Sequence, residues 1–431
     1  MKRTVLFSGI LLLIAVSVWS EGEQEKSGVE GPKIVTLYDW EASSTNLMVE
    51  GFNASHQDIQ INHQLVPAAD YETKILTLLA GGIDMDLYMQ KNQTHKFAHF
   101  GNGFIEVLDP YIEKFDADIS LVDAYRTDIT IEGQVVALPY RGAGTYLYYN
   151  KKLFDEAGEQ YPTVYVENGT WTWEKYREVA QNIASGDGKV WGSFMAPWGG
   201  PWQVPSLWQT GDPIISAEGQ IIYDPEAVVK AYKNRKILES TKAQPELSFI
   251  KATKLHYSQA FFQGNLGMLI IGEWFPGMLQ TAKKDNLFQG FTWDDWGITY
   301  IPTNEEHYSS PGGATFGHVA AVSKNKDAAF QVLAYMSLDP KGAKEAAEAG
   351  LMPAVIGEEV TEVLAGNIPD PESLGYYIAP FPRENPVNKY ASPRDDFISR
   401  LMEEYLITDM SDEELLKRFQ KGMEEVVNSV D

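Results

Sequence analysis

The sequence predicts an α/β protein with two lobes, each a mostly parallel sheet flanked by helices. The chain has 431 residues, which exceeds the size that one hydrophobic core usually organises, so two lobes of ordinary domain size are expected. Hydrophobic residues make up 44% of the chain and charged residues 22%, the balance of a folded globular protein. From residue 33 onward, strand-like and helix-like segments alternate, which is typical of a parallel sheet covered on both faces.

Hydrophobic spacing places the first elements of the chain. Strands are expected at 33–37, 59–65 and 86–90. A helix is expected over 71–79, because apolar residues recur there at helical spacing and the glycine pair that begins at Gly81 follows as a left-handed stop.

The ends of these strands supply the first candidate ligand-binding residues. In parallel α/β sheets, ligands bind beyond the carboxyl ends of the strands. The residues expected at such ends are Trp40, Glu41, Gln90, Lys91 and Asn92.

Two segments are expected to carry the chain between the lobes. Gly142 and Gly144 follow a strand-like run and give the chain the flexibility that suits a crossing. A second polar stretch runs from Pro302 to Gly313, and Gly313 is a further ligand-binding candidate. The predicted organisation is a signal peptide at 1–20, a flexible leader at 21–32, one lobe from 33–145 plus 311–350, and a second lobe from 146–310 plus 351–431.

The N-terminal residues predict export. Lys2 and Arg3 precede an apolar stretch from Val5 to Val18, and cleavage is expected after Ser20. As a helix this stretch spans about 21 Å, which is short of a bilayer core of about 30 Å. The chain contains no cysteine, which excludes a disulfide scaffold and lipid attachment through an N-terminal cysteine. We therefore expect a freely diffusing, periplasmic monomer.

Charge and aromatic content indicate the kind of ligand. The formal net charge is −25, and nucleic acids or anionic lipids need a basic surface, so no nucleic-acid partner is expected and a neutral ligand fits better. The 11 Trp, 22 Tyr and 19 Phe exceed what cores usually need. Trp and Tyr offer a flat apolar face with a polar edge.

Trp198 and Trp202 are the main candidates for stacking against a sugar ring. The glycines between them let the backbone approach a ligand closely. An indole face packs against the C–H face of a pyranose and contributes about 1 to 2 kcal/mol. A single tryptophan is more often a core residue, and that interpretation is kept for Trp171, Trp173 and Trp208.

Carboxylates form the second group of candidates. An ionised carboxylate accepts hydrogen bonds from two vicinal hydroxyls, and such bonds are about twice as strong as neutral ones. Position in the sequence favours Glu41, Asp70 and Glu273, and Glu273 follows a strand-like run with Trp274 beside it.

Motifs for metal binding or catalysis are weak. His95 and His99 stand four residues apart, but Lys96 occupies the place where a zinc protease needs glutamate, so a solvated face is expected. The sequence has no thiol nucleophile, Gly-x-Ser-x-Gly elbow or phosphate loop. No cofactor and no metal is therefore expected.

Several segments, taken in order, carry a resemblance to a known family. The most specific are Leu147-Tyr148-Tyr149-Asn150-Lys151 and Phe262-Gln263-Gly264-Asn265, the latter running on to Gly272-Glu273-Trp274. The sequence resembles the extracellular solute-binding proteins of ABC sugar importers, the cluster that includes maltose-binding protein. The wider likeness runs through residues 52–61, 71–87, 137–158, 261–274, 317–337 and 352–353.

The resemblance implies a two-lobed periplasmic-binding-protein fold and delivery of the ligand to the permease subunits of an ABC transporter. It implies that Trp274 stacks on a sugar and that Trp40 and Glu41 face the gap between the lobes. Some members carry an acidic residue shortly after the proline that corresponds to Pro139, where this chain has small residues. Arg141 is therefore expected to take over that edge of the site.

Three functions remain open from the sequence. A non-enzymatic binding protein would close on a mono- or oligosaccharide and dock on a membrane permease. A secreted glycosidase would need two carboxylates about 5 to 10 Å apart, and no such pair stands out in the sequence. A binding protein for a peptide or a polyamine is the third.

Overall fold

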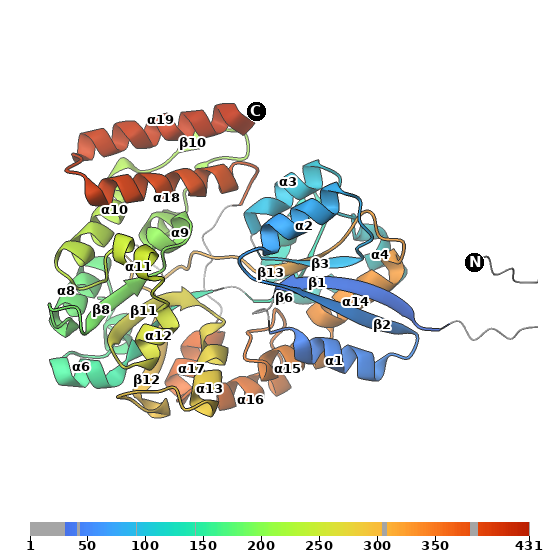
Figure 1. The fold of residues 1–431 in the computed structure, drawn as a ribbon, viewed down its shortest axis with the longest axis horizontal. Helices are drawn as coiled ribbons and strands as arrows, with labels where there is room; N and C mark the ends of the chain where they lie inside the picture. The colour runs from blue at the N-terminus through green and yellow to red at the C-terminus, as the bar shows by residue number, and fades with distance from the viewer. Residues whose placement is uncertain are drawn as a thin grey trace, which may run out of the picture.

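The computed structural model describes residues 31–40, 44–91, 93–142, 144–303, 308–379 and 387–430. The predicted signal peptide, most of the predicted leader and the candidates Glu41 and Asn92 lie outside the described residues. Among the helices of these ranges, none combines the length and the apolar character that a membrane span requires. Figure 1 shows two lobes side by side, each with a central sheet and helices packed around it.

The first lobe is built on a five-stranded sheet. Its strands are β1 (Lys33–Trp40), β2 (Ile59–Val66), β3 (Leu87–Gln90), β6 (Leu138–Arg141) and β13 (Thr315–Val319), in the spatial order β2-β1-β3-β13-β6. β1 pairs in parallel with β2 and β3, whereas β13 runs antiparallel to β3 and β6. Its longer helices are α1 (Asn46–Ser55), α2 (Tyr71–Ala80), α14 (Lys326–Leu338) and α15 (Pro340–Glu348).

Helix α2 illustrates how the sequence specifies these elements. It buries Tyr71, Ile75, Leu78 and Leu79, which fall on one face at helical spacing and join the core of the first lobe. The helix ends at Ala80, and Gly82 just beyond it adopts a φ of 60°. The apolar face therefore fixes where the helix packs, and the glycine pair fixes where it stops.

The second lobe is built on a four-stranded sheet. Its strands are β7 (Thr145–Asn150), β8 (Trp191–Met195), β11 (Leu266–Gly272) and β12 (Trp296–Tyr300), in the order β12-β7-β11-β8. β7 and β11 are buried along their whole length, which explains their continuous apolar and aromatic sequence. The helices around this sheet include α6 (Lys151–Ala157), α8 (Trp173–Ile183), α12 (Tyr257–Phe262), α13 (Phe275–Lys284) and α17 (Pro371–Ile378).

A separate core lies under the C-terminal helices. It joins α18 (Ala391–Ile407) and α19 (Asp412–Val430) to α9 (Gly200–Gln203), η3 (Pro205–Thr210) and α10 (Pro225–Ser240). Trp208 is one of its buried residues. α18 thereby packs against the short helix α9 that follows Trp198.

Shorter elements complete both lobes. Those of the first lobe are η1 (Gln93–His95), α3 (Lys96–Gly101), α4 (Asp109–Lys114), η2 (Ile119–Tyr125), α5 (Arg126–Ile129), β4 (Thr130–Ile131) and β5 (Gln134–Val135). The remaining ones are α7 (Pro162–Glu167), β9 (Ile214–Ile215), β10 (Ile221–Ile222), α11 (Leu247–Thr253), η4 (Trp293–Asp295) and α16 (Glu358–Asn367).

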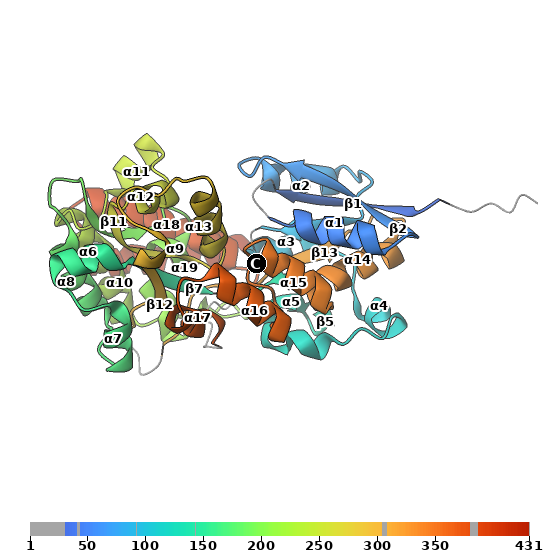
Figure 2. The same cartoon turned by 90° about the horizontal axis from the view of Figure 1, so that it is seen from below.

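Short segments of the chain connect the two sheets. β6 belongs to the first sheet and β7 to the second, so the chain crosses between Arg141 and Thr145. It returns between β12 and β13. Beside the first crossing, the backbone N–H of Gly142 donates to the carbonyl of Met352, so a third segment lies against it. Figure 2 shows α15 and α16 side by side at the junction of the two lobes.

The predicted two-lobed α/β fold is confirmed, with one correction. The sheets are mixed and not mostly parallel, because β13 is antiparallel in the first sheet and β7 is antiparallel to both of its neighbours in the second. Both strands enter their sheet directly from the other lobe. They therefore lack the helical crossover that makes consecutive strands parallel.

Candidate functional site

The tryptophans divide into interior and surface residues. Trp171, Trp173 and Trp208 are buried, as expected, and pack in the cores of the second lobe. Trp198 is 41% exposed, which is the largest exposed fraction of any tryptophan in the described part of the chain. An exposed indole is available for contact with a ligand.

Three aromatic side chains come together with Trp198. We call the four residues the aromatic cluster: Trp198, Trp202, Tyr257 and Trp274. The ring of Trp198 lies 5.4 Å from that of Trp202 and 5.7 Å from that of Tyr257, both nearly perpendicular, at 83° and 86°. Trp274 lies 6.3 Å from Trp198 and 5.6 Å from Trp202. Edge-to-face contacts of this kind favour fixed ring orientations, so Trp198 presents its exposed surface on a rigid base.

Local packing fixes the segment that carries Trp198. The side-chain amide of Gln203 donates to the carbonyls of Pro197 and Trp198, at 3.1 and 2.6 Å. A Cβ on Gly200 would lie 2.7 Å from the Trp208 ring, so glycine is required for α9 to approach the buried core beneath it. Gly200 therefore allows α9 to pack against the core, in addition to the expected role of the glycines in letting the backbone approach a ligand.

Trp274 is held against the end of β11. A Cβ on Gly272 would lie 2.0 Å from the Trp274 ring, so the indole packs over the backbone of that glycine. Its Nε1–H donates to the Tyr257 hydroxyl at 3.0 Å. Burial raises the pKa of Tyr257 to about 12, so this hydroxyl stays protonated at neutral pH. With its N–H occupied, Trp274 can offer a ligand its ring surface.

A buried ion pair lies beside the cluster. Arg141, at the end of β6, donates from Nε (3.0 Å) and Nη2 to the same carboxylate oxygen of Glu273, and both residues are 4% exposed. The guanidinium carbon lies 5.9 Å from the centre of the Trp274 ring. Burial alone lowers the pKa of Arg141, but the Glu273 carboxylate outweighs burial and the pKa is raised. The pair joins a strand of the first sheet to the aromatic cluster of the second lobe.

The other candidates lie on the first lobe, and the structure places them differently. Trp40 is buried, with its ring 5.5 Å from Tyr71 in an edge-on contact. Gln90 is also buried, and its Oε1 has no hydrogen-bond partner among the described residues. Lys91 is exposed, and its Nζ donates to the carbonyl of Ala68.

Two further candidates of the first lobe sit near loops. Asp70 is exposed and precedes α2, whose N-terminus it does not cap with its side chain. Gly313 faces the side chain of Gln93, which donates to the carbonyl of Ala314 at 2.6 Å.

The structure thus connects five of the candidates through direct contacts. These are Arg141, Trp198, Trp202, Glu273 and Trp274. Sequence reasoning missed Tyr257, which carries no glycine neighbour and no strand end to mark it. It also assigned Glu273 to sugar hydroxyls, whereas one of its oxygens already accepts from Arg141.

The chain matches a family over most of its length. Residues 48–358 match the family described as bacterial extracellular solute-binding protein. The chain belongs to this family. It is therefore a protein that binds a solute outside the cytoplasm.

Relatives of this solute-binding protein agree with that assignment. The lactose-binding protein of Rhizobium radiobacter is 23% identical over 315 residues, which cover 69% of each chain. A solved sugar transporter from Rhizobium etli, in an open conformation, is 24% identical with a TM-score of 0.73, covering 91% of this chain and 99% of the other. An ABC substrate-binding protein from Listeria monocytogenes in complex with cycloalternan is 23% identical with a TM-score of 0.76, covering 92% and 99%. At these identities the solved structures show a shared fold.

One expectation about this solute-binding protein is wrong. His99 was expected on a solvated face with His95, but it is 4% exposed and its Nδ1 lies 3.2 Å from the Tyr88 hydroxyl. The short helix α3 turns this residue toward the sheet, where burial and nearby His95 lower the pKa of His99 to about 4. In the described residues, no group of three or more His, Asp or Glu side chains could hold a metal ion.

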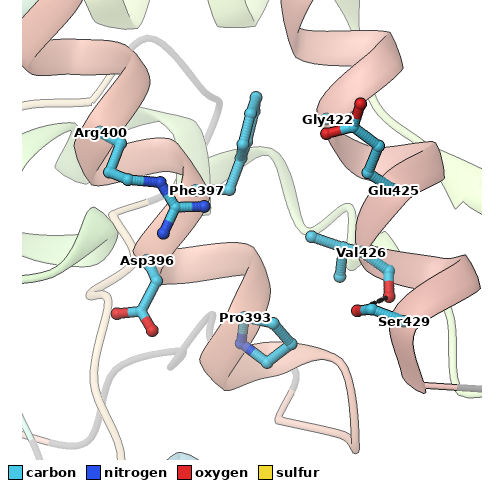
Figure 3. A pocket seen from close by; sticks show the side chains of 8 residues that line it. All are labelled: Pro393, Asp396, Phe397, Arg400, Gly422, Glu425, Val426 and Ser429. Carbon is cyan, nitrogen blue, oxygen red and sulfur yellow. Dashed lines mark hydrogen bonds between the residues drawn. The ribbon is translucent and has the colours of Figure 1, made fainter.

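A small surface cavity of about 190 Å³ lies elsewhere on the solute-binding protein, between α18 and α19. Figure 3 shows the Phe397 ring and the Arg400 side chain on α18 facing Val426 and Glu425 on α19. None of the predicted site residues lines it.

Proposed function

We propose that this solute-binding protein captures a mono- or oligosaccharide between its two lobes and delivers it to the permease of an ABC importer. The lobes would comprise 33–145 plus 311–350 and 146–310 plus 351–431. The observation that carries the proposal is the aromatic cluster, in which the exposed Trp198 is held by three further rings. Indole faces of this kind suit the apolar C–H faces of a pyranose.

The relatives support a carbohydrate as the solute. One is named a lactose-binding protein, and a protein of the same fold was solved in complex with cycloalternan. The acidic net charge of −25 is compatible with a neutral ligand. A sugar that contacts both lobes at once favours the closed arrangement, which is how binding is coupled to docking on the permease.

The proposed location is the periplasm. The basic residues Lys2 and Arg3, the apolar stretch and the small residues before position 21 support a cleavable signal peptide. The absence of cysteine supports a protein that is not lipid-anchored, and we propose that it acts as a monomer.

We propose that the protein is not an enzyme. A glycosidase needs two carboxylates about 5 to 10 Å apart, one of which must be free to act as acid or nucleophile. Glu273 directly precedes Trp274 of the aromatic cluster, and its carboxylate is already paired with Arg141. The same pairing argues against a polyamine, which would require unpaired acidic groups.

A ligand screen with product analysis tests this proposal. Purified mature protein is mixed with neutral mono- and oligosaccharides, peptides and polyamines, and thermal unfolding and released reducing ends are both measured. We expect at least one sugar to raise the Tm, because a ligand that binds the folded state stabilises it, and no reducing ends to appear. Release of reducing ends, or a raised Tm with peptides or polyamines alone, would contradict the proposal.

A further inference from the structure

The Arg141–Glu273 pair is one of three buried arginine–carboxylate pairs of the described residues, with Arg235–Glu239 and Arg394–Asp395, and it is the one whose guanidinium lies over a ring of the aromatic cluster. Many of the other pairs are on the surface, such as Lys251–Glu403, whose side chains are 44% and 46% exposed. Surface pairs of that kind are screened by water and have little influence on a ligand. The buried pair acts in a low-dielectric environment, where an uncompensated charge would be felt strongly.

The positive charge of Arg141 and the negative charge of Glu273 compensate each other beside the aromatic cluster. Both donors of Arg141 reach the same oxygen of Glu273, and the guanidinium lies 5.9 Å from the Trp274 ring centre. Glu273 also contributes its backbone carbonyl, which accepts from the Tyr377 hydroxyl, so its position is fixed from two sides. Two opposite charges in contact have no net charge and leave only a dipole field, which weakens with distance faster than the field of either charge alone.

We propose that the Arg141–Glu273 pair determines the charge specificity of the site, so that uncharged sugars are selected over uronates and amino sugars. The inference rests on the proposed function and specifies its ligand class. Either charge alone would attract a ligand of the opposite charge, and the balanced pair attracts neither. Specificity then comes from the match between the two side chains and not from a hydrogen bond of either one to the sugar.

Glu273→Gln tests the proposal directly. A guanidinium does not lose its proton in proteins, so this variant leaves a single positive charge beside Trp274. Dissociation constants are measured for glucose, galactose, lactose and maltose, and for glucuronate and galacturonate. We expect the affinity for uronates relative to neutral sugars to rise about tenfold over that of the wild type. Arg141→Gln is the mirror variant, and at pH 8 it should shift the preference toward a glucoside with a trimethylammonium group, whose positive charge does not depend on pH.

Two further variants make the outcome decisive. The charge-swapped variant, Arg141→Glu with Glu273→Arg, keeps a buried pair and should keep the wild-type preference even if a single variant fails to fold. Its loss of neutral-sugar binding while folded, as judged by circular dichroism, would mean that Arg141 contacts the sugar itself and would overturn the proposal. Lys251→Gln removes an exposed charge and should leave the preference unchanged.

The two proposals fail in distinguishable ways. A wild-type protein that binds none of these sugars contradicts the proposed function. A wild-type protein that binds neutral sugars, with folded single variants that keep its preference unchanged, contradicts the role of the pair alone.

Discussion

At the scale of single residues, Gly272 decides where the Trp274 ring lies. The indole packs directly over the glycine backbone, at a place where any side chain would meet it. The ring in turn donates to Tyr257 and contacts Trp198 and Trp202. A glycine on a buried strand thus controls the geometry of a binding surface.

Gly272→Ala should therefore weaken ligand binding while the fold is kept. The added Cβ would lie 2.0 Å from the ring, which must swing away and break its contacts with the other aromatic side chains. We expect a loss of about tenfold in sugar affinity and a changed tryptophan fluorescence spectrum. Gly366→Ala, at a glycine with nothing within 4 Å of its Cβ position, is the matched control. Equal affinity of the two variants would refute this role.

His99 makes stability depend on pH. Burial lowers its pKa from 6.5 to about 4, so the unfolded chain binds more protons than the folded protein between these values. Stability should then fall as pH decreases from 6.5 to about 4, by about 1.4 kcal/mol per pH unit for this residue. Urea unfolding of the wild type and of His99→Gln over this range measures the difference. Parallel pH profiles for the two proteins would contradict the burial of His99.

Single residues of the candidate site could be predicted from the sequence better than contacts between pairs of residues. Flanking glycines and strand ends pointed to Trp198, Trp202 and Trp274, whose rings are in contact in the structure. The partner of Glu273 lies 132 positions away, so no local pattern could pair it with Arg141. Contacts between distant segments depend on the folded arrangement, which a pattern of spacings does not encode.

At the scale of elements, the spacing of apolar residues and the positions of glycines were enough to predict where strands and helices lie. The helix predicted over 71–79 is α2, and the strands predicted at 33–37 and 59–65 are parts of β1 and β2. The direction of the strands within each sheet was harder to predict from the sequence. β13 and β7 come from the opposite lobe, so their antiparallel pairing follows from the route of the chain and not from their own sequence.

The contact of α8 with β8 gives a test at this scale. A Cβ on Gly192 would lie 1.8 Å from the carbonyl oxygen of Ala180, so the helix could not approach the strand as it does. Gly192→Ala should destabilise the protein by about 3 kcal/mol, because backbone atoms must move apart. Denaturant unfolding measures the effect, again with Gly366→Ala as the control. A loss below about 0.5 kcal/mol would show that the helix and strand are not packed this closely.

At the scale of the whole molecule, two sheets and several crossings place a strand end of one lobe beside the aromatic rings of the other. Arg141 is the last residue of β6, and Glu273 directly follows β11. Their ion pair lies close to the first crossing, where the chain leaves Arg141 for β7. Motion of the lobes about this region would change the surroundings of the aromatic cluster.

Export is a property of the whole chain, and processing of its N-terminus can be measured. Expressed in a Gram-negative host, the full sequence should yield a mature protein that begins at Glu21 and is released by osmotic shock, because its apolar stretch is too short to span a bilayer. Mass spectrometry of the released protein reads the new N-terminus. Recovery of the uncleaved chain from the membrane fraction would contradict the predicted signal peptide.

Isothermal titration of neutral sugars into the wild type, Trp198→Ala and Phe249→Ala tests most directly whether the aromatic cluster binds a sugar. Phe249 is 46% exposed and lies outside the cluster, so it controls for the loss of an exposed ring. We predict micromolar binding of at least one sugar by the wild type, weakened about 5- to 30-fold by Trp198→Ala and unchanged by Phe249→Ala. Sugar binding that is equally strong in all three proteins, or absent from the wild type, would contradict the claim that the aromatic cluster binds a sugar.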